Sequence, residues 1–223
     1  MGALILNVLP YGLAAALAAP IVAVVTAVIL AKSERPLLSA WTFTAGAAAL
    51  DIAYAVGLLA LANASGGFEG SSNAGAIVDL VLGAIFLALG IQAVFSHESP
   101  EKDASRRERV DRAASAGLKG MLITGVVAQL INIDAMAVFA GAIKETAEAN
   151  LSSAESAIAL LVALAVMLIP YYGPTIAYAF SPERAGRVLG EMSEWLLGHS
   201  RGLEIVVGLG FGAIFLAKGI ATI

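Results

Sequence analysis

The stretch Gln129-Leu130-Ile131-Asn132-Ile133-Asp134 lies inside an apolar run, from Met121 to Ala142, that otherwise resembles a membrane-spanning helix. Two amides and a carboxylate at membrane depth are costly, so each must face protein, water or an ion rather than lipid. Helical spacing places Gln129 and Asn132 on one face and turns Asp134 away from Asn132, unless the helix is broken there. A polar centre of this kind in a membrane bundle indicates a transport site.

The composition of the whole chain indicates an integral membrane protein. Of its 223 residues only 13% are charged, whereas a soluble domain has about a quarter. The apolar N-terminal run is much longer than a signal peptide, which predicts a retained span. The absence of cysteine excludes disulfides and thiolate metal sites. No nucleotide loop, nucleophile–base pair or nucleic-acid patch stands out, so we expect neither an enzyme nor a nucleic-acid partner.

Six segments are long and apolar enough to cross a bilayer, which takes about 20 residues each. They are 4–31, 39–62, 76–95, 118–143, 154–180 and 203–222. Pro20 is expected to break the first segment, because proline removes a helical hydrogen bond. The run Pro170-Tyr171-Tyr172-Gly173-Pro174 is expected to break the fifth, and the polar stretch at Asn132 the fourth. The predicted fold class is therefore an all-α membrane protein with broken helices.

The basic residues predict the orientation of these spans in the plasma (inner) membrane. Eleven of the 13 Lys and Arg residues lie in the three loops that follow the first, third and fifth segments. The other two, Lys144 and Lys218, belong to the opposite side. Short loops rich in Lys and Arg stay in the cytoplasm, so both chain termini are expected outside.

The chain also contains an internal repeat. Gly83–Ile91 matches Gly212–Ile220 at eight of nine positions, and Gly12–Lys32 can be aligned with Gly125–Glu145 without gaps. The predicted interruptions at Ala19-Pro20 and at Asn132 then fall at matching places. Each half holds three helices, so the second half enters the membrane from the opposite side. Inverted repeats of this kind are a transporter architecture, with the site at the midplane.

The predicted organisation follows from this repeat. Residues 1–95 form the first three-helix repeat, 96–117 a charged cytoplasmic linker, and 118–223 the second repeat. Within the second repeat, 183–198 carries apolar residues on one face and is expected to lie along the inner membrane surface as an amphipathic helix.

Two aspartates are the main candidates for the site. Asp51 lies near the middle of its segment and Asp134 somewhat off-centre, and no Lys or Arg occurs at the same depth to neutralise them. Each is stabilised either by a bound cation, by a proton taken up during a transport cycle, or as a protonated aspartate that bonds to a neighbouring helix. The other candidate lining residues are Gln129, Asn132, Pro20, Tyr171, Tyr172 and Thr175. A kink packed by aromatic residues is the alternative for the tyrosines.

Any ion at this site is expected to be hard. The two histidines fall in predicted cytoplasmic loops, so only carboxylates, amides and carbonyls remain as ligands. These oxygen ligands suit a proton, Na⁺ or a divalent cation such as Mg²⁺, Mn²⁺ or Ca²⁺. For a divalent metal the ligands would be Asp134, Asp51 and Asn132.

The chain resembles the LysE superfamily of membrane exporters, and within it the sulfolipid- and glycopeptidolipid-addressing (Sap/GAP) proteins of actinobacteria. The motifs that carry this resemblance are Ala19-Pro20, Phe43-Thr44-Ala45-Gly46, Gly83–Gly90, Asn132 and Gly212–Gly219. One motif differs, because the addressing proteins usually carry Asn-Pro-Lys where this chain has Asn132-Ile133-Asp134. That variant looks more like the cation-exporting branches, while the absence of cysteine sets the chain apart from the thiol-transporting branch.

These observations predict a secondary exporter of a small solute or a cell-envelope lipid, coupled to protons or Na⁺. A hard divalent-cation exporter is the first alternative, and a non-transporting accessory subunit of a lipid-export complex is the second. The expected partners are the lipid bilayer and a small-molecule, ion or lipid substrate. A second copy of the chain, as in a homodimer, is left open.

Overall fold

The computed structural model describes residues 2–64, 74–95, 117–149 and 152–222, and every regular element in these ranges is a helix. The helices are α1 (Gly2–Leu17), α2 (Pro20–Lys32), α3 (Pro36–Ala64), α4 (Ala74–Phe95), α6 (Leu118–Ile131), α7 (Ile133–Glu148), α8 (Ser153–Met167), α9 (Ile169–Phe180) and α10 (Pro182–Thr222). The all-α prediction is confirmed for these residues. Apart from Gly117, the predicted linker 96–117 lies outside the described residues.

Several of these helices have the length and apolar character of membrane spans. Among the described residues, one straight helix segment, Pro36–Leu61 of α3, is sufficient by itself. Three further pairs qualify only together, bent by 62° between α1 and α2, 76° between α6 and α7, and 66° between α8 and α9. Up to four spans result if each bent pair crosses as one. Helices α4 and α10 contribute the shorter apolar segments Phe86–Phe95 and Gly208–Ala221, so the arrangement as six spans stays a prediction.

Proline accounts for the position of two of the bends. Pro20 is the first residue of α2 and Pro170 lies in the first turn of α9. A proline is tolerated there because the amide it lacks has no helical partner in the first turn. The second bend therefore falls at Leu168, just before the Pro170–Pro174 run that was expected to contain it. Helix α9 continues through Pro174.

The bend between α6 and α7 has no proline or glycine to cause it. Asn132 ends α6 and begins α7 with φ −81° and ψ 57°, and its side chain caps neither helix. Its backbone N–H still donates to the backbone carbonyls of Ala128 and Gln129, which closes the last turn of α6. Because nothing local breaks the helix, the contacts around Asn132 determine the bend.

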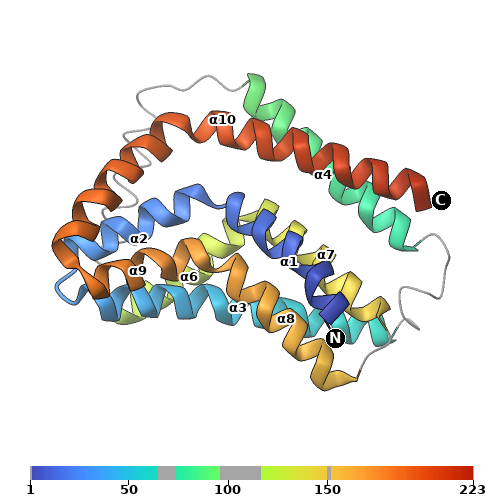
Figure 1. The fold of residues 1–223 in the computed structure, drawn as a ribbon, viewed down its shortest axis with the longest axis horizontal. Coiled ribbons are helices and arrows are strands. Elements are labelled where there is room, and N and C mark those ends of the chain that lie inside the picture. Colours follow the sequence, from blue (N-terminus) through green and yellow to red (C-terminus); the bar gives the residue numbers. More distant parts are fainter. Residues whose placement is uncertain (1, 65–73, 96–116, 150–151, 223) are drawn as a thin grey trace.

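Helix α10 differs from the prediction. The chain is helical from Pro182 to Thr222, without the break that was expected between an interfacial helix and the last span. Figure 1 shows α10 curving over the rest of the molecule and running alongside α4. Its apolar face at 183–198 is divided, since Ala185 and Leu189 are buried in the core whereas Val188 and Trp195 are exposed. The location of this segment at the membrane surface stays a prediction.

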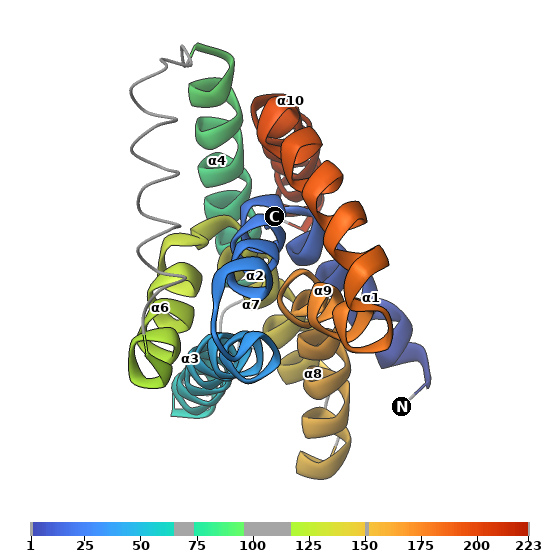
Figure 2. The same cartoon turned by 90° about the vertical axis from the view of Figure 1, so that its left-hand side faces the viewer.

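The most extensive helix packing is that of α4 on α10, of α3 on α6, and of α1 on both α8 and α7 (Figures 1 and 2). The α3–α6 pair approaches most closely at Gly46 and Gly125. A Cβ atom on Gly46 would collide with the carbonyl of Leu122, and one on Gly125 with the carbonyl of Phe43. Small residues at such a crossing allow the two backbones to touch. The largest fully buried side chains among the described residues include Phe43, Met121, Phe139, Met167 and Tyr171.

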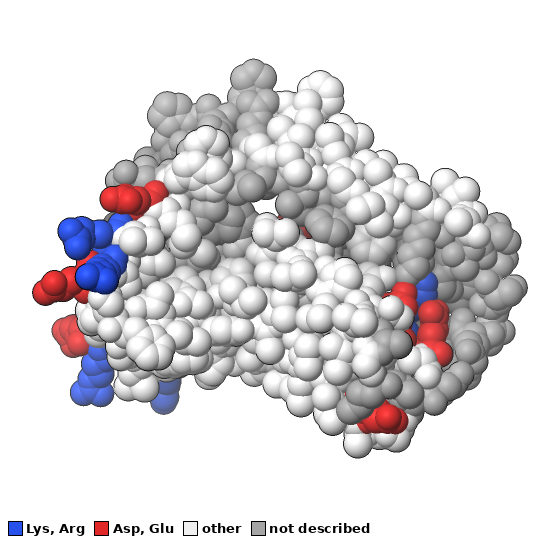
Figure 3. Space-filling model, viewed as in Figure 1, with Lys and Arg blue, Asp and Glu red and all other residues white. Residues whose placement is uncertain are grey.

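The charged side chains gather at two ends of the face shown in Figure 3, with a largely uncharged band between them. One end carries most of the Lys and Arg visible in this view, and in Figure 1 it holds the α2–α3 connection and the start of α10. The opposite end shows mainly acidic side chains. A band of this kind between charged ends is expected of a protein that crosses a bilayer.

A capping box begins α8 and supports a first prediction. The Ser152 hydroxyl accepts a hydrogen bond from the Glu155 amide, and the Glu155 carboxylate accepts one from the Ser152 amide at 3.2 Å. Replacing Ser152 with alanine removes an N-cap, so we expect the free energy of unfolding to fall by about 1 kcal/mol. The measurement is denaturant unfolding in detergent micelles. The control is Ser153→Ala, one residue inside the helix, and an equal effect of the two substitutions would contradict the role of the cap.

Candidate functional site

Asp51 lies in the middle of α3 and is fully buried. Its partner is Gln129 of α6, also fully buried, whose Nε2 donates a 2.8 Å hydrogen bond to Asp51 Oδ1. The hydrogen bond between Asp51 of α3 and Gln129 of α6 can form because the backbones of these helices touch at Gly46 and Gly125. Among the described residues no Lys, Arg or His pairs with Asp51. The carboxyl group is therefore held in the protein interior by an amide.

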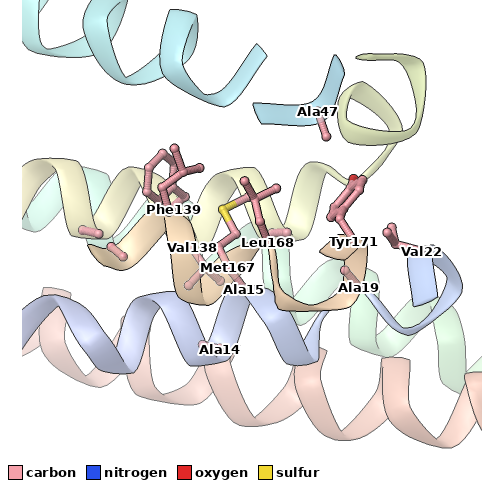
Figure 4. Close-up of a cluster of buried hydrophobic side chains, with 14 of the residues drawn as sticks. Ala14, Ala15, Ala19, Val22, Ala47, Val138, Phe139, Met167, Leu168 and Tyr171 are labelled. Atoms are coloured by element: carbon pink, nitrogen blue, oxygen red, sulfur yellow. The ribbon is translucent and has the colours of Figure 1, made fainter. Parts of the chain in front are cut away.

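Tyr171 of α9 extends the same chain of hydrogen bonds. Its buried hydroxyl donates to Gln129 Oε1 at 2.5 Å, so the bonds run from α9 through α6 to α3. Its ring packs on Phe43, with centroids 5.3 Å apart. In Figure 4 the Tyr171 ring points toward Ala47 of α3, and Ala19 and Val22 of the α1–α2 bend lie close by. The packing of the ring thus fixes the direction in which the hydroxyl donates.

Asn132, at the α6–α7 bend, lies next to the Tyr171 hydroxyl. We call Asp51, Gln129, Asn132 and Tyr171 the polar cluster. Two of its buried atoms, Asp51 Oδ2 and Asn132 Nδ2, have no hydrogen-bond partner in the described part of the chain. One is an acceptor and the other a donor. Buried polar groups are nearly always paired, so these two atoms indicate a place for a proton, a water molecule or a ligand group.

The remaining predicted site residues have different surroundings. Thr175 is fully buried, and its hydroxyl donates to the Tyr171 carbonyl at 3.4 Å, so it supports the cluster from α9. Tyr172 donates to the Ala165 carbonyl on an exposed side of the bend. Asp134 is half-buried in the first turn of α7, where the amides of Asp134 and Ala135 donate to its carboxylate. Pro20 begins α2, and its side chain lies outside what the structure describes.

A second polar group was not anticipated. Lys144 was assigned to an outer loop, but α7 continues to Glu148 and buries Lys144 inside the helix, 4.0 Å from the Glu148 carboxylate. The Tyr11 hydroxyl of α1 donates to Glu145 at 3.1 Å. The alternating alanine, lysine and glutamate residues after Ile143 favour a helix, and this was the signal that could have revealed the extension.

The donors of the polar cluster bear on which ion it could hold. The described residues contain no group of three His, Cys, Asp or Glu side chains suited to a metal ion. A divalent metal here would have one carboxylate, Asp51, and otherwise amide and phenol oxygens. Gln129 and Tyr171 each donate a hydrogen bond to another member of the polar cluster. Hydrogen-bond donors suit a carboxyl group that binds and releases a proton better than a metal that needs six or more oxygens.

The apolar helices, the charged ends and the buried polar cluster define a helical membrane protein. The chain belongs to the family described as Sap, sulfolipid-1-addressing protein, whose sequence profile matches residues 8–221. This confirms the resemblance to the sulfolipid-addressing proteins, while membership of the wider LysE superfamily stays a prediction. Comparison with curated proteins and with solved structures found no significant match.

Proposed function

We propose that this protein is a multi-pass exporter that moves a cell-envelope lipid across the plasma membrane, and that Asp51 couples the transport to protons. The observation that carries the proposal is the buried Asp51 carboxyl group, which has one oxygen bonded to Gln129 and the other without a partner. An ionisable residue of this kind inside a membrane protein is functional by default. The sulfolipid-addressing family supports a lipid as the substrate.

The surroundings of Asp51 support a proton as the coupling ion. It faces Gln129 from α6 and Tyr171 from α9, and neither of these carries a charge that would hold the carboxylate permanently ionised. Proton uptake would neutralise Asp51 in the interior. Proton release would leave a charge that, among the described residues, is stabilised by the hydrogen bond from Gln129 and by no opposite charge. The polar cluster would therefore differ in charge between two steps of a cycle.

The charge distribution supports an orientation. The basic end in Figure 3 corresponds to the predicted cytoplasmic loops, so we place this end in the cytoplasm and both chain termini outside. Figure 1 shows the C-terminus at the opposite end, which is compatible with this orientation.

The test is transport of sulfolipid-1 in liposomes that contain the purified protein and carry a pH gradient. Appearance of the lipid in the opposite leaflet is expected for the wild type and is expected to be lost in Asp51→Asn, which can still accept the bond from Gln129. The control is Glu183→Gln, the same change on an exposed residue of α10. This control is expected to transport like the wild type.

Two results would contradict the proposal. Transport by wild type that is unaffected by Asp51→Asn would show that Asp51 does not couple it. No movement of sulfolipid-1 by the wild type under either direction of the gradient would favour an accessory role. Calorimetry with Na⁺, Mg²⁺, Mn²⁺ and Ca²⁺ tests the coupling ion. Saturable binding of one of these cations that is lost in Asp51→Asn would show that this cation, and not a proton, binds at Asp51.

A further inference from the structure

The two bent pairs α1–α2 and α6–α7 have the same local geometry at equivalent positions. In the gap-free alignment of Gly12–Lys32 with Gly125–Glu145, Ala19 corresponds to Asn132. Ala19, the N-cap residue just before α2, has φ −113° and ψ 45°. Asn132, the N-cap residue just before α7, has φ −81° and ψ 57°. The bends of 62° and 76° are also similar. Two different local sequences, Ala19-Pro20 and Asn132-Ile133, thus interrupt their helices at equivalent positions of the repeat.

The packing of α4 against α10 is reciprocal in the same sense. A Cβ atom on Gly83 would meet Leu216, and one on Gly212, its equivalent in the repeat, would meet Leu87, the equivalent of Leu216. Gly90 meets Leu209 and its equivalent Gly219 meets Leu80 in the same way. Contacts that remain when the two partners are exchanged are those of a local two-fold axis between antiparallel helices.

The same exchange relates two other pairs. Helix α6 packs on α3 with Gly125 against Phe43, and the equivalent α1 packs on α8 with Gly12 against Ala163. Gly12 and Gly125 are aligned in the repeat. These crossings support two halves that are built alike and related by the same axis.

Some contacts do not follow the exchange, and the contact between α1 and α7 is the largest of these. Helix α1 packs along α7, where the Tyr11 hydroxyl donates to Glu145 and a Cβ atom on Gly141 would meet the Tyr11 ring. The equivalent pair is α6 with α2, and these helices make no comparable contact in the described structure. The equivalent residues there are Thr124, Lys32 and Val28, and Thr124 donates to Gly120 of its own helix instead. The α1–α7 contact between the halves is therefore made without its α6–α2 equivalent in this arrangement.

We propose that the protein alternates between this arrangement and a second one in which the two halves of the repeat exchange their roles. In the second arrangement α2 packs on α6 and α1 separates from α7. This inference rests on the proposed transport function and adds the gating contacts. Equivalent halves can exchange their contacts because the second state replaces the contacts of Tyr11 with Glu145 and Gly141 by contacts of Thr124 with Lys32 and Val28. The bends at Ala19 and Asn132 lie beside the polar cluster, so exchange would open it alternately to the two sides of the membrane.

The chain has no cysteine, so engineered pairs test this directly. The pair Tyr11→Cys with Gly141→Cys reports the α1–α7 contact, and Val28→Cys with Thr124→Cys reports the α2–α6 contact. A short cleavable bifunctional maleimide is applied to each purified variant in lipid nanodiscs. We expect both pairs to crosslink, and in the four-cysteine variant we expect either crosslink to prevent the other. Either crosslink is expected to abolish sulfolipid-1 transport, and cleavage of the reagent to restore it.

The control pair is Leu87→Cys with Gly212→Cys on the α4–α10 contact, which is expected to crosslink under all conditions. The inference is overturned if the α2–α6 pair never reacts while the control pair does, or if both gating crosslinks form in one molecule. Spin-label distances across the same two pairs provide a second readout that does not need transport. Mutually exclusive crosslinks without sulfolipid-1 transport would refute the proposed function and leave the exchange of contacts intact.

Discussion

Replacing Gln129 with leucine is expected to lower the free energy of unfolding by about 3–5 kcal/mol, because two buried polar groups would each lose a hydrogen-bond partner, at about 1–3 kcal/mol for each. Gln129 is completely buried and satisfies two groups, Asp51 through Nε2 and Tyr171 through Oε1. Leucine has a similar size but bonds to neither, so both groups would lose their partner without any change in volume. The measurement is unfolding of the purified protein in mixed micelles, followed by circular dichroism.

The same experiment shows whether polarity or packing causes the loss. The triple variant Gln129→Leu, Asp51→Val, Tyr171→Phe removes all three members of the hydrogen-bonded chain and leaves Asn132 unchanged, so most of the lost stability should return. Tyr172→Phe is the control for the tyrosine, because its hydroxyl bonds on an exposed side of α9. A triple variant as unstable as Gln129→Leu would contradict the hydrogen-bond explanation. If the triple variant regains stability but does not transport, the polar cluster serves function at the expense of stability.

Replacing Gly125 with alanine is expected to have a second large effect, a loss of about 3 kcal/mol or more. The new Cβ atom would meet the carbonyl and carbonyl carbon of Phe43 and the amide of Ala47, all backbone atoms that cannot rotate away. Helices α3 and α6 would have to separate, and the bond between Gln129 and Asp51 would lengthen with them. The loss of stability should therefore be accompanied by a loss of transport.

Gly57→Ala is the matched control on α3, because nothing lies within 4 Å of a Cβ atom at Gly57. It is expected to be neutral or to stabilise the helix by up to about 1 kcal/mol, since alanine is the better helix former. Gly46→Ala tests the other half of the crossing and should resemble Gly125→Ala. Equal, small effects of all three substitutions would show that α3 and α6 do not touch at these glycines.

Much of the site was predictable from single residues. Asp51, Gln129 and Asn132 stood out because polar side chains in apolar segments are costly, and that cost does not depend on the rest of the fold. The tyrosines after Pro170 were candidates because proline interrupts helices. The bend at Asn132 was predicted by its polar neighbours and by the repeat, although it contains no residue that breaks a helix.

The choice between candidates required the structure. Asp134 and Asp51 are both aspartates within apolar segments. Asp51 accepts a hydrogen bond from Gln129, which is itself held by Tyr171, whereas the backbone amides of Asp134 and Ala135 donate to the Asp134 carboxylate. The continuation of α7 to Glu148, which buries Lys144, and the unbroken α10 were also not predicted. The helix-favouring Ala, Lys and Glu residues after Ile143 were the missed signal for α7, whereas the charged residues at the start of α10 are compatible with a separate surface helix as well as with a continuous one.

The sequence by itself determined that this is an all-helical membrane protein of the sulfolipid-addressing family, and which residues are too polar for lipid. Only the tertiary structure decided which of these residues meet. In a soluble helix the apolar face indicates the side that packs. In these helices the residues that face lipid and those that face protein are both apolar, so the rotation of α3 against α6 cannot be inferred from the pattern. It is set by the close approach at Gly46 and Gly125, and this approach places Asp51 opposite Gln129.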